Sequence, residues 1–94
     1  MTKTEVLKQV YGLSVNGNFN GEHLSFTKFK SFVEETLDRK KKKTNDVYES
    51  ADMRIKLPDG VWFMSITRFR DGFWDYYIPE TREDERRVFG KVAV

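Results

Sequence analysis

The fold is decided by residues 53–79, which read MRIKLPDGVWFMSITRFRDGFWDYYIP and contain two turn signals. Pro58-Asp59-Gly60 and Asp71-Gly72 favour turns, because proline sets φ at the first turn position and glycine accepts a positive φ. The runs beside these turns are rich in the β-branched and aromatic residues that strands favour. The pattern therefore predicts a three-stranded antiparallel meander. Its strands are expected at residues 47–57, 61–70 and 73–78.

Two amphipathic segments before the meander predict helices. Thr2 and Glu5 have the spacing of a capping box, so a short helix is expected to begin there. Ser25 is a good N-cap for a second helix. The apolar residues of this second segment recur at helical spacing, at Phe26, Phe29, Phe32, Val33 and Leu37. This stripe is the expected cover for one face of the sheet.

The remaining segments are less regular. Residues 13–22 contain two Asn-Gly pairs, which favour turns. We expect either a loop anchored by Val15 and Phe19 or a small hairpin. Thr81 is a candidate cap for a polar C-terminal helix through Arg87, and residues 88–94 are apolar enough for a final strand or a docked tail. The chain is thus expected to be one small α+β domain at residues 1–94, with two N-terminal helices packed on the meander and a polar C-terminal helix or tail.

The expected turn lengths assign side chains to the two faces of the meander. A two-residue loop at Asp71-Gly72 pairs Arg68 with Asp75, and a three-residue loop at residues 58–60 pairs Ile55 with Phe63. The face expected to be the core carries Met53, Ile55, Leu57, Val61, Phe63, Phe69, Trp74, Tyr76 and Ile78. The opposite face carries Arg54, Lys56, Trp62, Met64, Ile66, Arg68, Arg70, Phe73 and Tyr77.

The second of these faces is the candidate partner-binding surface. It mixes Trp, Tyr, Met and Arg, which are enriched at protein interfaces. An apolar patch of this kind on an open surface typically marks a binding site. Three occupants remain open: another segment of this chain, a second copy in a homodimer, or a separate partner. The predicted partner-binding residues are Arg54, Trp62, Met64, Arg68, Arg70, Phe73 and Tyr77.

A run of five positive charges, at Arg39, Lys40, Lys41, Lys42 and Lys43, forms a candidate electrostatic patch. It is open to three interpretations: a solvated helix end, a contact with phosphates, or a contact with an acidic protein surface. The net charge of the whole chain is only +2, which by itself does not argue for nucleic acid.

Catalytic groups are sparse in this sequence. There is no cysteine, which excludes disulfides and thiolate metal sites and favours a cytoplasmic location. His23 is the only histidine and stands near a predicted helix start, where a capping or surface role is usual. No glycine-rich phosphate loop or nucleophile-elbow motif is present. We therefore expect no enzyme activity, no cofactor, no metal site and, since no long apolar stretch occurs, no membrane partner.

These observations lead to an expected function. We expect a non-enzymatic protein-interaction module, a regulator or inhibitor that docks on a larger cytoplasmic protein through the aromatic and arginine face. Small size and heavy use of aromatics suit an accessory protein such as a bacteriophage encodes. The alternative is a nucleic-acid-binding protein that uses the same face together with the basic run at residues 39–43.

Overall fold

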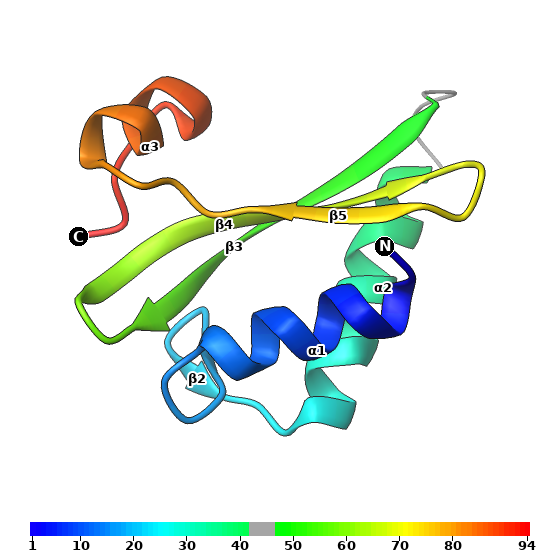
Figure 1. The fold of residues 1–94 in the computed structure, drawn as a ribbon, viewed down its shortest axis with the longest axis horizontal. Helices are drawn as coiled ribbons and strands as arrows, with labels where there is room; N and C mark the ends of the chain where they lie inside the picture. Colours follow the sequence, from blue (N-terminus) through cyan, green and yellow to red (C-terminus); the bar gives the residue numbers. More distant parts are fainter. Residues whose placement is uncertain (42–46) are drawn as a thin grey trace.

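The computed structural model describes residues 1–41 and 47–94, and in this part of the chain three helices accompany a five-stranded antiparallel sheet (Figure 1). The predicted α+β class is confirmed, and the predicted meander forms part of a larger sheet. The strand order is β2-β1-β3-β4-β5. The elements are α1 (Lys3–Leu13), β1 (Asn18–Phe19), β2 (Glu22–His23), α2 (Phe26–Lys41), β3 (Tyr48–Leu57), β4 (Gly60–Phe69), β5 (Trp74–Tyr77) and α3 (Arg82–Phe89).

Residues 13–22 satisfy both of the alternatives expected for them. A two-residue turn at Asn20-Gly21, with both residues at positive φ, joins β1 to β2. Phe19 of this hairpin is fully buried and pairs with Ile55 of β3, so the hairpin extends the sheet and anchors the loop. Gly17 is required here because a Cβ atom would lie 2.5 Å from the Leu24 carbonyl oxygen.

Helices α1 and α2 lie on the same side of the sheet (Figure 1), and we call this side the helix face. Both predicted N-caps form, since Thr2 accepts a hydrogen bond from the Glu5 N–H and Ser25 accepts one from the Lys28 N–H. Apolar side chains of the two helices meet the sheet in one buried cluster. Its members include Val6, Leu7, Val10, Phe29, Val33, Leu37, Met53, Ile55, Met64, Ile66 and Trp74.

The β3–β4 turn has a different length from the one predicted. Leu57 pairs with Gly60, so the loop contains only Pro58 and Asp59. Ile55 consequently pairs with Trp62, and the prediction that Ile55 lies opposite Phe63 is wrong. Residues paired across an antiparallel ladder point to the same face. The even-numbered residues of β4 therefore lie on the helix face.

The β4–β5 turn departs from its prediction in the opposite direction. The Phe69 N–H donates to the Phe73 carbonyl at 2.9 Å, and the loop between them has three residues, ending on Gly72 at φ 89°. Arg68 thus pairs with Trp74, not with Asp75 as predicted. Because the two one-residue errors cancel, β3 and β5 keep their predicted faces and only β4 is turned over. Val61, Phe63 and Phe69, predicted for the core, lie on the opposite side of the sheet, which we call the outer face.

The polar C-terminal helix α3 forms as predicted from its cap residue. Thr81 accepts a hydrogen bond from the Asp84 N–H, and Gly90 ends the helix in the left-handed conformation at φ 78°. Helix α3 lies over the outer face at one end of the sheet, on the side opposite α1 and α2 (Figure 1). In the described part of the chain, no helix combines the length and the apolar character needed to cross a membrane.

Candidate functional site

One end of the outer face is closed by α3 and its C-terminal extension. Phe63 of β4 stacks on Phe89 of α3, with ring centroids 5.5 Å apart, and Tyr77 of β5 also stacks on Phe89. Arg54 and Lys91 place their charged groups over the Phe63 ring. Phe63 is only 6% exposed, although it does not belong to the main buried cluster. This end is therefore a second, smaller core.

Helix α3 is fixed in place by the backbone of β4. The last residue of β5 is Tyr77, so β4 has no strand partner beyond Ser65 on that edge. The Phe63 N–H instead donates to Glu85 Oε2 at 2.8 Å, and Arg82 Nη1 donates to the Val61 carbonyl at 2.8 Å. These two side chains take the place of the missing strand, because they supply hydrogen-bond partners to backbone groups at this edge of β4.

Glu85 is fully buried, yet it stays in its charged form. Burial raises the pKa of the Glu85 carboxyl, but hydrogen bonds from the Phe63 N–H, Arg82 and the Ala93 N–H outweigh this, and its pKa is lowered. Its partner Arg82 also lies over the Trp62 ring, 3.7 Å from the centroid. The carboxylate therefore joins β4, α3 and the C-terminal tail in one polar network.

The other end of the outer face, beside the β4–β5 turn, carries three neighbouring aromatic rings. Tyr48 pairs with Phe69 across β3 and β4, and Phe69 is hydrogen bonded to Phe73 through the backbone. The ring centroids are 6.1 Å apart for Tyr48–Phe69 and 5.7 Å apart for Phe69–Phe73. Tyr48 is 52% and Phe73 48% exposed. We call Tyr48, Phe69 and Phe73 the aromatic patch. Among the described elements, α3 lies at the other end of this face (Figure 1).

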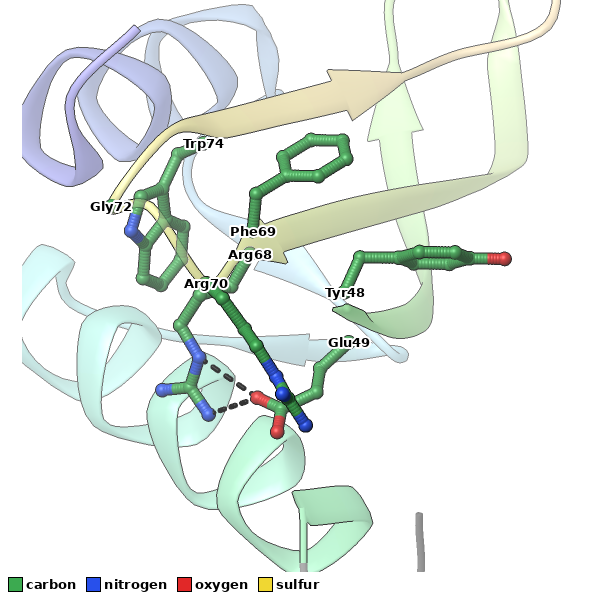
Figure 2. Close-up of a pocket in the computed structure, with 7 residues that line it drawn as sticks. All are labelled: Tyr48, Glu49, Arg68, Phe69, Arg70, Gly72 and Trp74. Carbon is green, nitrogen blue, oxygen red and sulfur yellow. Dashed lines mark hydrogen bonds and ion pairs between the residues drawn. The ribbon is translucent and has the colours of Figure 1, made fainter. Parts of the chain in front are cut away.

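A pocket of about 460 Å³ adjoins the aromatic patch (Figure 2). Arg68 and Glu49 form an ion pair at its wall, and the Phe69 ring points away from this pair (Figure 2). Arg68 also donates to Asp38 of α2 at 3.0 Å. Burial lowers the pKa of Arg68, but its hydrogen bonds to Glu49 and Asp38 prevail and raise it, so the guanidinium stays charged. Through these two ion pairs, Arg68 links β4 to β3 and α2.

The predicted partner-binding residues do not share one face. Trp62 and Met64 are buried on the helix face, and the Trp62 Nε1–H donates to Asp59 Oδ1 at 3.1 Å. Arg68 lies on the same face. The register shift of β4 accounts for all three placements. The structure leaves Arg54, Phe73 and Tyr77 on the outer face and Arg70 exposed in the β4–β5 turn.

Two members of the aromatic patch were missed by the sequence prediction. Tyr48, like Arg54 and Lys56, stands at an even-numbered position of β3, so these three side chains point to the same face. Extending the predicted alternation back to residue 48 would therefore have found Tyr48. Phe69 was assigned to the core because of the β4 register. In the basic run, Arg39 is exposed on α2, while Lys42 and Lys43, like the side chains of Lys40 and Lys41, lie outside the described residues.

Within residues 1–41 and 47–94, no group of three His, Cys, Asp or Glu residues is arranged to hold a metal ion. His23 is exposed on β2. Comparison of the chain with protein-family models, with curated proteins and with solved structures finds no match.

Proposed function

We propose that the protein is a non-enzymatic binding module that docks on a larger protein through the aromatic patch. The observation that carries this proposal is the exposure of Tyr48 and Phe73 beside Phe69 on an otherwise well-packed sheet. Aromatic side chains on a rigid sheet supply large contact area at a small entropic cost, which makes them typical interface anchors.

The charges beside the patch favour a protein over a nucleic acid. Arg70 is exposed in the β4–β5 turn, but Asp71 in the same turn and Asp75, two residues after Phe73, are exposed as well. Nucleic acids are held largely by neutralising phosphates with cations, and two carboxylates oppose this. A protein surface tolerates such a mixed rim.

Capture of partners from a lysate of the source cell, with nuclease added, tests this proposal. The Phe73→Ser variant removes one ring of the patch, and Val88→Ser is a matched control because Val88 is 52% exposed on α3, at the other end of the outer face. We expect one protein to be retained by the wild type and by Val88→Ser and lost by Phe73→Ser. Equal retention by both variants would contradict the proposal.

The second candidate is a nucleic-acid-binding protein, favoured by one observation. The basic run at residues 39–43 ends five residues before Tyr48, so stacking rings and positive charges are close in the sequence. This candidate predicts that a labelled single-stranded oligonucleotide binds and that its affinity falls steeply with salt. Binding that is insensitive to salt would exclude it.

A further inference from the structure

Three positive side chains gather at the α3 end of the outer face, away from the aromatic patch. Arg54 and Lys56 are exposed on β3, and Lys91 is exposed just after α3. The Arg54 guanidinium carbon lies 5.1 Å and the Lys91 ammonium 5.4 Å from the centroid of one ring, that of Phe63. Two cations are thus positioned by the same buried side chain. We call Arg54, Lys56 and Lys91 the basic cluster.

The nearby carboxylates of α3 do not neutralise this cluster. Glu85 forms an ion pair with Arg82 and accepts a hydrogen bond from the Phe63 N–H of β4. Asp84 forms an ion pair with Arg87 at 2.8 Å. Across the described part of the chain, no ion pair involves a member of the basic cluster. Like charges held close together repel, and a bound anion relieves this repulsion.

A pocket of about 460 Å³ opens beside Arg54 and Lys56, within the size range of small-molecule sites. Its described lining contains no Asp or Glu. Val61 and Ala93 supply an apolar wall, while Asn20 borders the pocket from the β1–β2 turn. The Asn20 N–H donates to the Arg54 carbonyl at 2.8 Å, and Asn20 Oδ1 accepts from the Arg54 N–H at 2.9 Å. These bonds fix the backbone beneath the Arg54 side chain.

From this geometry we propose that the pocket binds a phosphorylated small molecule. Its phosphate lies against Arg54 and Lys56, with Lys91 alongside, because a guanidinium presents paired N–H donors that match phosphate oxygens. The organic part of the ligand lies against Val61 and Ala93. This site is independent of the aromatic patch, since the two occupy opposite ends of the outer face.

Titration calorimetry at constant ionic strength tests the site, with sodium pyrophosphate and ADP as probes. We expect both to bind, and Arg54→Gln and Lys56→Gln each to weaken binding by about tenfold, as loss of a charge-assisted hydrogen bond predicts. Lys8→Gln is the matched control, because Lys8 is exposed on α1 and its loss changes the net charge equally. Circular dichroism verifies that each variant is folded.

Four outcomes separate the possibilities. Tighter binding of ADP than of pyrophosphate, with both weakened in Arg54→Gln and Lys56→Gln, supports an organic phosphate, whereas equal binding supports a site for the phosphate groups alone. Absence of heat from both probes overturns the proposal. Equal weakening in Lys8→Gln also overturns it, because a general charge effect would then account for binding.

Discussion

The two ends of the outer face carry similar aromatic residues but differ in how they are covered. At one end, Phe63 is packed under Phe89 and is 6% exposed; at the other, Phe73 is 48% exposed. The difference arises from the β4 edge, where Glu85 and Arg82 bind backbone groups of Phe63 and Val61. Helix α3 is therefore fixed at its own end and does not extend over the β4–β5 turn. Within residues 1–41 and 47–94, the fold therefore leaves Tyr48 and Phe73 of the aromatic patch exposed.

The largest expected effect is on the covered end, with Phe63→Ala. Removing a buried phenyl ring leaves a cavity beneath Phe89 and should lower the free energy of unfolding by about 3–5 kcal/mol. Urea denaturation followed by circular dichroism measures it. A loss below about 1 kcal/mol would show that α3 does not pack on Phe63.

A similar loss is expected from Glu85→Ala, which leaves the Phe63 N–H and the Arg82 guanidinium without their acceptor. Breaking a buried ion pair of this kind typically costs about 3–5 kcal/mol, and partial exposure of Arg82 places this variant near the lower end. Glu83→Ala is the control, because Glu83 is exposed and stands two residues before Glu85 in the same helix. It should lower the free energy of unfolding by only a few tenths of a kcal/mol, on the order of a helix-dipole contact. Similar losses in both variants would contradict the edge-capping role of Glu85.

The lowered pKa of Glu85 also predicts how stability depends on pH. A carboxyl whose pKa is lower in the folded than in the unfolded state stabilises the fold above the ordinary value of 4.5, and this contribution is lost as the pH falls through the lowered pKa. Unfolding free energies of the wild type and Glu85→Gln, measured from neutral pH to about pH 2, should converge in acid. A constant difference across this range would show that the pKa of Glu85 is not lowered.

The smallest effect on stability is expected at the open end, with Phe73→Ala. Because about half of its surface already faces solvent, the free energy of unfolding should fall by less than about 1 kcal/mol. Urea denaturation beside Phe63→Ala gives the comparison directly. A loss as large as that of Phe63→Ala would mean that the turn end is covered as well.

The sequence predicted most elements and the three helix N-caps, but not the register of β4. Residues 61–64 of β4 read Val-Trp-Phe-Met, so apolar side chains point to both faces and alternation does not choose between them. Gly60 follows the first loop and Gly72 ends the second, but a glycine does not reveal whether the loop has two residues or three. By contrast, β3 alternates cleanly from Met53 to Leu57, and its faces were predicted correctly.

The role of α3 could not be predicted for a related reason. Its sequence, REDERRVF, indicates only a solvated polar helix with acidic residues near its start. Glu85 is buried because it meets unpaired backbone groups of β4, more than twenty residues earlier, and no local pattern reports such a contact. In the aromatic patch, sequence reasoning found Phe73 but not Phe69, because the predicted register of β4 placed Phe69 on the core face.

The division of the outer face into a covered and an open end is tested most directly by paramagnetic relaxation of aromatic ring protons with a soluble gadolinium chelate. The account predicts strong relaxation at Tyr48 and Phe73 and protection at Phe63 and Phe89. Protection of all four rings would show that the aromatic patch is covered, and strong relaxation at Phe63 would show that α3 does not close its end of the sheet. Either result would contradict the account.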